Sequence, residues 1–332
     1  MRALVTGASG FVGSTLAKEL VSRGIEVVAL MRRTSGASNL EDIKYTRAEG
    51  SLFDRDSLAR AMTDVDLVFH AAGVTTALDE SGFMLNNADG TRNVAEAAAH
   101  AGARLKRVVY ISSLAAGGPS SRAAPRTETD GDAPVSAYGR SKLQGEVELL
   151  KHKDRYGVAI IRPPIVYGPR DKAVFSLIKM LAHGLMPLMR GSSGDGKKYY
   201  STIHASDLAR MIADAGITAQ IPSGEVFYAC SNNATSYEQI LDAAAHALGT
   251  RPLKFTIPMP LVTAAAYALS AVAKITRKPG ALGVDKLNEF RPDCWTCSNG
   301  KARSALGFRP AFEIGNGMHD TIAWYRKKGW LK

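Results

Sequence analysis

The sequence contains little cysteine: only Cys230, Cys294 and Cys297 occur among its 332 residues. So small and odd a number excludes the disulfide framework of a small secreted protein and indicates a reducing compartment, so we expect a cytoplasmic protein. Cys294 and Cys297 have the spacing of half a zinc site, but no second pair of ligands follows at a suitable distance. We therefore predict that the protein binds no metal.

The sequence also lacks a visible signal peptide and a long hydrophobic run. It begins directly with a strand-like segment rather than with a basic region followed by an apolar one. Its most apolar stretch, residues 261–273, is too short to span a bilayer. We expect this stretch to form a packed helix of a substrate domain. The alternative is peripheral membrane contact, which the basic residues beside it favour: Lys254, Lys274, Arg277 and Lys278.

The net charge is +11, but the basic residues do not form a block with interleaved aromatics. Because lysine and arginine are spread along the chain, we predict no nucleic-acid partner and a small-molecule substrate instead. The content of 45% hydrophobic and 22% charged residues is typical of a globular protein with one large or two closely associated domains.

Glycine, by contrast, occurs in an informative pattern near the N-terminus. Gly7, Gly10 and Gly13 follow the apolar run of residues 3–5, and apolar residues then recur at helical spacing. A second strand-like run, residues 26–31, completes a βαβ unit. Glycines in such a turn let a pyrophosphate approach the backbone at the N-terminus of the helix. The pattern therefore predicts a dinucleotide-binding site.

Strand-like and helical segments continue to alternate as far as about residue 168, which predicts an α/β fold with a Rossmann-type, doubly wound parallel sheet. The alternation then loosens, which indicates a smaller, interwoven C-terminal substrate domain. We assign residues 1–168 to the nucleotide-binding domain, with a returning segment near 203–230. Residues 169–202 and 231–332 are assigned to the substrate domain.

Three polar residues are candidates for proton exchange with a substrate, although a tyrosine and a lysine at this spacing are also common as an exposed pair on a helix. Tyr138 and Lys142 are four residues apart, so they share one face of a helix. An ammonium group near a tyrosine lowers its pKa by favouring the phenolate, which would suit Tyr138 for proton exchange with a substrate. Ser113 follows a predicted strand, from which its hydroxyl could donate to a substrate carbonyl oxygen.

With these motifs together, the chain resembles the extended short-chain dehydrogenases/reductases of the NAD-dependent epimerase/dehydratase superfamily. It is most similar to the branch of the 3β-hydroxysteroid dehydrogenases and dihydroflavonol reductases. The resemblance covers nearly the whole chain and rests on the glycine motif, the trio of Ser113, Tyr138 and Lys142, and these further motifs: "HAAG" from His70, "NADGTRNV" from Asn87, "RPPIVYGP" from Arg162, "IHASDLA" from Ile203 and "KARSALGFRP" from Lys301.

The resemblance implies a role for each of these residues. Tyr138 would be the general acid/base, Lys142 its electrostatic helper and a ligand of the cofactor ribose, and Ser113 the ligand of the substrate carbonyl, with Ser112 as the fallback. Asn87 would support the cofactor side of the site. The implied cofactor-binding residues besides the arginines discussed next are Gly7, Ser9, Gly10, Phe11, Val12, Gly13, Leu52, Ala71, Ala72, Gly73, Asn87, Ile111, Tyr138, Lys142, Pro163 and Ile165.

The end of the second predicted strand bears on the choice of cofactor. An NAD enzyme normally offers a carboxylate to the ribose there, whereas this chain has Met31 followed by Arg32 and Arg33. Guanidinium groups suit a 2′-phosphate, so we favour NADP and keep NAD as the alternative. Ser51 stands where many relatives place an acid that contacts adenine, so we expect Leu52 to pack on the base.

Two details bear on the substrate. Sugar-nucleotide enzymes usually carry an asparagine where this chain has Pro164 and Ile165, and Ser113 is followed here by Leu-Ala-Ala, as in the reductase branch. The apolar stretch near residue 265 would also suit a hydrophobic substrate pocket. Against this, five basic residues could clamp a diphosphate: Arg170, Lys172, Lys197, Lys198 and Arg303.

We therefore predict an NADP-dependent oxidoreductase that transfers hydride between nicotinamide and a secondary alcohol or ketone of a bulky, apolar, sterol- or flavonoid-like substrate. The alternative is a nucleotide-sugar 4-epimerase or dehydratase with a retained cofactor, and a remote one is a non-catalytic cofactor-sensing protein. Because relatives often dimerise through a four-helix contact that would include the Tyr138 helix, a homodimer also stays open.

Overall fold

The computed structural model describes residues 1–121, 123–192, 194–280 and 282–331 of the chain. Its main feature is a seven-stranded sheet with the strand order β11-β6-β5-β4-β1-β2-β3, in which every neighbouring pair is parallel. Its strands are β1 (Arg2–Thr6), β2 (Glu26–Met31), β3 (Thr46–Glu49), β4 (Leu67–His70), β5 (Arg107–Ile111), β6 (Gly157–Arg162) and β11 (Glu225–Tyr228). This is the predicted Rossmann-type doubly wound sheet.

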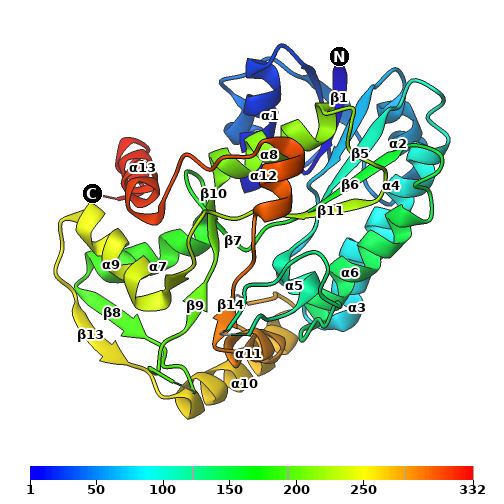
Figure 1. Cartoon of the computed structure of the whole chain (residues 1–332). Coiled ribbons are helices and arrows are strands. Elements are labelled where there is room, and N and C mark those ends of the chain that lie inside the picture. The colour runs from blue at the N-terminus through cyan, green and yellow to red at the C-terminus, as the bar shows by residue number, and fades with distance from the viewer. Residues whose placement is uncertain (122, 193, 281, 332) are drawn as a thin grey trace.

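Helices cover both faces of this sheet (Figure 1). One face carries α1 (Phe11–Ser22) and α8 (Ala205–Ile217), which pack against each other. The other face carries α2 (Arg55–Met62), α4 (Gly90–Ala99) and α6 (Ala137–Leu150). Because both faces are buried, the inner strands are largely apolar rather than alternating in polarity, whereas the edge strand β3 is polar and mostly exposed.

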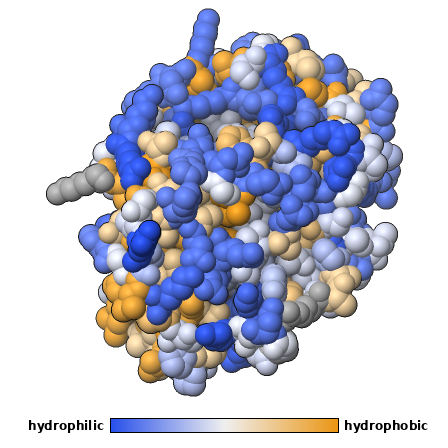
Figure 2. Space-filling model, turned by 60° about the vertical axis from the view of Figure 1, so that its left-hand side comes forward, coloured by the Kyte–Doolittle hydropathy of each residue, from blue (hydrophilic) through white to orange (hydrophobic). Residues whose placement is uncertain are grey.

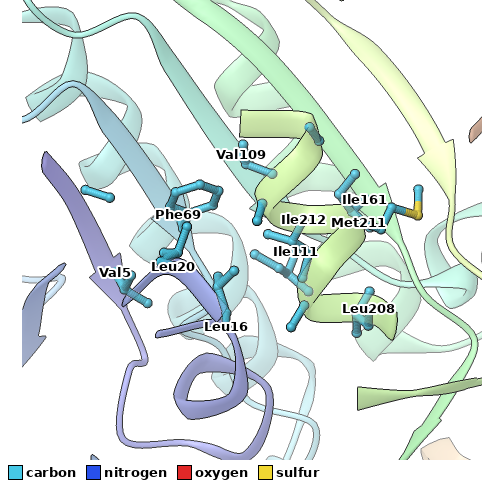
Figure 3. Packing of buried hydrophobic residues seen from close by; sticks show 14 of the residues in the cluster. Val5, Leu16, Leu20, Phe69, Val109, Ile111, Ile161, Leu208, Met211 and Ile212 are labelled. Carbon is cyan, nitrogen blue, oxygen red and sulfur yellow. The ribbon is translucent and has the colours of Figure 1, made fainter. Parts of the chain in front are cut away.

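The packing on the first face shows how distant segments meet (Figure 3). Phe69 and Val109 project from neighbouring strands of the sheet toward Leu20 of α1 and Ile212 of α8, and all four side chains are 0% exposed. The segment around α8 and β11 thus returns to the sheet, although residues of the second part of the chain precede it. A later helix, α12 (Gly300–Leu306), also packs on this side through Ala302.

The second part of the molecule has its own core, formed mainly by α7 (Lys172–Ala182), α9 (Tyr237–Leu248) and α13 (Ile314–Lys327). Small sheets accompany these helices. They contain β7 (Ile165–Tyr167), β8 (Leu185–Leu188), β9 (Tyr199–Tyr200), β10 (Thr202–His204), β12 (Thr235–Ser236), β13 (Leu253–Thr256) and β14 (Cys294–Trp295).

The predicted packed helix over residues 261–273 is the clearest error of the sequence interpretation. The structure has an 18-residue helix, α10 (Met259–Thr276), at the lower edge of the molecule in Figure 1. Ala266 is its only buried residue. Sequence alone could not reveal this, because an apolar helix has the same composition whether it is covered or exposed.

The sheet places its functional edge where its strand order reverses. β1 has β2 on one side and β4 on the other, and the chain crosses over through β3 and α2 to reach β4. In register, Thr6 at the end of β1 pairs with Leu30 and His70, and His70 pairs with Tyr110. The carboxyl ends of four strands therefore lie together at the switch point, where doubly wound sheets bind ligands.

Candidate functional site

The glycine turn after β1 is closely packed backbone. Gly7 has a φ of +70°, and a Cβ atom added to it would lie 2.7 Å from the backbone nitrogen of Ala72. A Cβ on Gly13 would lie 2.1 Å from the carbonyl oxygen of Gly7. Only glycine fits these two positions, which confines the turn to one compact path.

The N-terminus of α1 is left open by this turn. Its N-cap is Gly10, which provides no side-chain acceptor for the first N–H groups. Phe11 and Val12 are the first two helical residues, and the carbonyl oxygen of Ser9 accepts a hydrogen bond from Asn39 Nδ2 at 2.9 Å. Free N–H groups and the positive end of a helix suit a pyrophosphate, so the turn fits a dinucleotide.

The end of β2 presents two guanidinium groups to solvent. Arg32 and Arg33 follow the buried Met31 and are both exposed. Their carbonyl oxygens accept hydrogen bonds from Arg47 Nη2 at 2.9 and 3.2 Å. Arg47 thus holds the backbone of this loop in place and adds a third positive charge beside the strand end.

Leu52 lies on the sheet face that carries α4. Its carbonyl oxygen accepts a hydrogen bond from Asn93 Nδ2 at 2.9 Å, and a Cβ on Gly90 would lie 3.1 Å from Leu52 Cδ1. Ser51 is occupied locally, since its backbone N–H donates to Ser57 Oγ. The structure therefore provides a half-buried apolar side chain here.

The segment after β4 passes close to the cofactor turn and to α6. Ala71 and Ala72 donate their N–H groups to the carbonyl and hydroxyl oxygens of Thr6. Gly73 lies between two polar groups, because a Cβ added to it would be 2.9 Å from Asn87 Oδ1 and 3.2 Å from Lys142 Nζ.

Asn87 is 1% exposed and sits in a short π-helical segment, η2 (Met84–Asp89). Its amide accepts from the N–H of Val74 at 2.8 Å and donates to Ser141 Oγ at 3.0 Å. Asn87 therefore ties the loop after β4 to the helix that carries Lys142. π-Helical turns of this kind are frequent at functional sites.

His70 has a structural role in this arrangement. It is 0% exposed, and its two ring nitrogens lie 2.7 Å from Thr6 Oγ1 and 3.0 Å from Thr91 Oγ1. Burial and the nearby charge of Lys142 lower the pKa of His70 to about 3. The imidazole is therefore neutral at physiological pH and links β1, β4 and α4 without taking up a proton.

The structure brings Ser113, Tyr138 and Lys142 together, as the sequence pattern predicted. Ser113 caps the short helix α5 (Leu114–Gly117) and forms a hydrogen bond with Tyr138. Lys142, one turn after Tyr138 on α6, donates from Nζ to the carbonyl oxygen of Ile111 at 2.8 Å. The two hydroxyl groups and the ammonium group thus surround the carboxyl end of β5.

The electrostatics of this trio differ in one respect from the sequence expectation. The pKa of Tyr138 is raised to about 12 rather than lowered, because burial and the charge of Glu289 outweigh the hydrogen bond with Ser113. Burial lowers the pKa of Lys142 to about 8, with Glu146 opposing the shift. Tyr138 is therefore a protonated hydroxyl at neutral pH, and Lys142 is still mainly a cation.

Ser112, the fallback for Ser113, points into a buried ion-pair network instead. Its hydroxyl donates to Glu146, and Glu146 also accepts from Arg162 Nη2 at 2.6 Å. Arg162 in turn pairs with Asp132 at 2.6 Å. Ser112 is thus committed to holding α6 against β6, which leaves Ser113 as the serine that faces Tyr138.

The residues that follow β6 lie beside the carboxyl end of β5. Pro163 is buried, and its carbonyl oxygen accepts from the N–H of Leu114 at 2.8 Å. Ile165, two residues later, is 40% exposed. An apolar side chain is therefore available to a ligand where an asparagine would offer a polar one.

Sequence reasoning missed α11 (Val284–Phe290), whose carboxylates hold the start of α6. Asp285 Oδ1 accepts from the N–H of Ala137 at 2.7 Å, and Glu289 Oε1 accepts from Ser136 Oγ at 2.7 Å. Ser136 is the N-cap of α6. A cleft separates this helix from the loop after β4. It is lined by Thr75, Thr76, Ala77, Phe83, Tyr138, Gly280, Gly283, Asp285, Lys286 and Glu289.

The basic residues considered for a diphosphate clamp have different neighbours. Arg170 lies over the ring of Trp324 on α13, with its Cζ 5.5 Å from the ring centre. Lys198 is 2% exposed and donates to the carbonyl oxygen of Pro292 and to Asp293. Lys172 opens α7, and Arg303 lies on α12. Neither these four residues nor Lys197, the fifth, lines the cleft beside Tyr138 in the described part of the chain.

The chain is similar in sequence and fold to several known proteins. A sequence model of the "NAD dependent epimerase/dehydratase family" matches residues 3–228. The chain is 30% identical to a ceramide reductase of Caulobacter vibrioides, with 98% of this chain and 95% of that protein covered. It is 31% identical to a UDP-glucose 4-epimerase of Mycolicibacterium smegmatis, with 99% of both chains covered. The structure of MoeE5 in complex with UDP-glucuronic acid and NAD is similar at a TM-score of 0.76 and 25% identity, covering 99% of this chain and 100% of that one.

Proposed function

The chain belongs to the NAD dependent epimerase/dehydratase family, within the extended short-chain dehydrogenases/reductases, and we propose that it is an NADP-dependent oxidoreductase of a bulky, apolar alcohol or ketone. The observation that carries the proposal is the hydrogen bond between the hydroxyl groups of Ser113 and Tyr138 beside the cleft. Two hydroxyl groups so placed can both donate to one carbonyl oxygen, which is what reduction of a ketone requires.

A nicotinamide held beside these residues would supply the hydride for reduction of the carbonyl group. In the direction of reduction, Tyr138 donates its proton to the oxygen as negative charge develops there, and Ser113 donates a hydrogen bond to the same oxygen. The high pKa of Tyr138 keeps its proton in place until that charge appears. Of the three protons on Lys142 Nζ, one is used by Ile111, so the ammonium group can also bind the ribose hydroxyls.

The cofactor would be held at the glycine turn and at the end of β2. The open N-terminus of α1 suits the pyrophosphate, and the exposed Arg32 and Arg33 suit a 2′-phosphate rather than two free ribose hydroxyls. Leu52 would pack on the adenine. These features support NADP, with NAD as the alternative.

The character of the cleft supports an apolar substrate. Asp285, Lys286 and Glu289 line it next to Tyr138, and Lys286 forms an ion pair with Glu289. The lining therefore has more carboxylates than cations, which disfavours the diphosphate of a nucleotide sugar. Ile165 and Phe83 offer apolar surface nearby. The similarity to a ceramide reductase favours a lipid-like ketone or alcohol.

A nucleotide-sugar 4-epimerase is the second candidate, because the chain is 31% identical to such an enzyme over 99% of both proteins. The same residues would serve it, with Tyr138 removing a proton from the sugar hydroxyl and later returning it. Proton removal needs the phenolate form of Tyr138, which its raised pKa disfavours. The two candidates differ in the net change of the cofactor. An epimerase returns the cofactor to its starting oxidation state, whereas a reductase leaves it oxidised.

The test is the absorbance of reduced nicotinamide when the protein meets NADPH and a panel of long-chain and steroid ketones, with UDP-glucose in parallel. We expect net oxidation of NADPH with an apolar ketone. Tyr138→Phe should lower kcat at least about a hundredfold while binding NADPH as well as the wild type does. Tyr199→Phe, which removes a hydroxyl bonded to the exposed Asp195, is the matched control. Retained turnover in Tyr138→Phe, or isomerisation of UDP-glucose without net oxidation, would overturn the proposal.

A further inference from the structure

The helix α10 turns an apolar face to solvent. Leu261, Val272 and Ile275 are 62%, 53% and 83% exposed. With the exposed Ala265 and Ala268 they recur every three or four residues, so they form one stripe along the helix. A helix on the surface of a globular protein normally presents its polar face to water. The helix α10 presents apolar side chains to water instead.

The exposed stripe is part of a wider apolar surface. Leu253 and Phe255 of the preceding strand β13 are 70% and 37% exposed, and Leu185 of the paired strand β8 is 43% exposed. Figure 2 shows hydrophobic residues gathered in the lower part of the molecule, at the height where Figure 1 places β13 and α10. Extended apolar patches of this kind mark interaction surfaces.

The helix α10 has 18 residues and is longer than the apolar stretch 261–273, which we expected to be too short to span a bilayer. By length and composition α10 could cross a membrane, but its packing points to a different placement. Ala266, near its middle, is 0% exposed, and Ser270 Oγ accepts a hydrogen bond from the N–H of Val284 at 3.0 Å. The helix therefore lies along α11 with one side against the protein. A helix held in this way along its middle can enter a bilayer only sideways, with its outer face down.

The charge around the helix favours an anionic surface. Between Asp242 and Asp285 the sequence has no acidic residue, while it has five basic ones. One of the five, Lys254, pairs with Glu238 and Asp242, which leaves four at this surface. Lys274, Arg277 and Lys278, at the C-terminal end of α10, are all exposed. Basic residues beside an apolar stripe are attracted to the negatively charged headgroups of lipids.

We propose that α10, together with β13, docks the protein on the surface of an anionic lipid bilayer. The docked helix leads directly to the site, since Gly280, Gly283 and Lys286, which follow it, line the cleft that contains Tyr138. An apolar substrate could then pass from the bilayer to the cleft. Docking on the bilayer does not depend on the proposed reaction, whereas the passage of substrate from the bilayer to the cleft rests on the proposed function.

The test is co-sedimentation of the full chain with vesicles, without cofactor or substrate, so that its outcome is separate from that of the activity assay. We expect sedimentation with vesicles of phosphatidylcholine and phosphatidylglycerol, and much weaker binding to phosphatidylcholine alone or at high salt. Protein that stays entirely in the supernatant with the anionic vesicles would overturn the proposal.

Paired variants distinguish vesicle binding through α10 from nonspecific binding by exposed apolar residues elsewhere. Val272→Ser with Ile275→Ser should weaken vesicle binding roughly tenfold or more, since two exposed apolar side chains are lost. Met180→Ser with Ile217→Ser changes two exposed apolar residues elsewhere and should bind as the wild type does. Thermal melts followed by circular dichroism check that both variants fold.

A second copy of the chain is the competing occupant of this face. Light scattering after gel filtration gives the mass of the wild type and of the Val272→Ser, Ile275→Ser variant. A wild-type dimer that the double substitution converts to a monomer, without vesicle binding by either protein, would replace the bilayer with a dimer interface. Equal vesicle binding by the wild type and this variant would also contradict the proposal.

Discussion

The carboxylate of Asp285 accepts a hydrogen bond of 2.7 Å from the backbone N–H of Ala137, although 148 residues separate them in the sequence. Ala137 is the first residue of α6, so Asp285 satisfies an N–H group that has no partner within the helix and places negative charge at the positive helix end. The next residue of the helix is Tyr138. The position of its hydroxyl group is therefore fixed in part from the other half of the molecule.

Replacing Asp285 by alanine should loosen the start of α6. We expect the free energy of unfolding to fall by about 1 kcal/mol, the usual effect of losing a helix cap, and kcat to fall while the Kd of NADPH changes little. Urea denaturation gives the free energy of unfolding, and steady-state kinetics give kcat. Asp285→Asn keeps an acceptor oxygen, so its free energy of unfolding and its kcat should fall less than those of Asp285→Ala. An Asp285→Ala protein with unchanged stability and kcat would show that the contact positions nothing.

The exposed arginines at the end of β2 should decide the choice between cofactors. We expect Arg32→Ala with Arg33→Ala to raise the Kd of NADPH about tenfold or more, because charge-assisted hydrogen bonds to the 2′-phosphate are lost. The Kd of NADH should change less than about twofold. Titration followed by protein fluorescence measures both constants.

Arg60→Ala is the matched control, since Arg60 is an exposed arginine on α2 away from the end of β2. It should leave both dissociation constants unchanged. If the wild type binds NADH more tightly than NADPH, the interpretation of Arg32 and Arg33 is wrong.

Local patterns in the sequence were enough to predict the cofactor turn and the pairing on α6. Gly7 and Gly13 are set by backbone geometry within one turn, and Tyr138 and Lys142 by the period of one helix. The strand β2 has the predicted bounds of Glu26–Met31. Each of these features depends on neighbours in the sequence, which is why the residues alone indicate them.

Features that depend on tertiary packing escaped the sequence interpretation. The contact of Asp285 with α6 joins segments that no local pattern connects. The pKa of Tyr138 follows from burial and from Glu289, neither of which can be read from the residues near it. The exposure of α10 likewise depends on what the rest of the chain leaves uncovered.

Lys142 should make the fold less stable at neutral pH than at high pH. Burial lowers its pKa to about 8, below the ordinary value of 10.5, so between these values the folded protein holds the lysine neutral while the unfolded chain holds it charged. The unfolded state then binds the extra proton, and stability rises with pH through this window. Below pH 8 the folded state must bury the charge, and the stability gained at high pH is lost.

Lys142→Met should therefore unfold at higher urea concentration than the wild type at pH 7. We expect a gain of roughly 1–2 kcal/mol, because relief from burying a charge exceeds the loss of one hydrogen bond to Ile111. The gain should shrink between pH 8 and pH 10, where the wild type itself becomes more stable, and NADPH should bind more weakly at every pH. If the two unfolding curves keep the same separation from pH 7 to pH 10, the lysine does not bury a charge, and its hydrogen bond to Ile111 is its main contribution to stability.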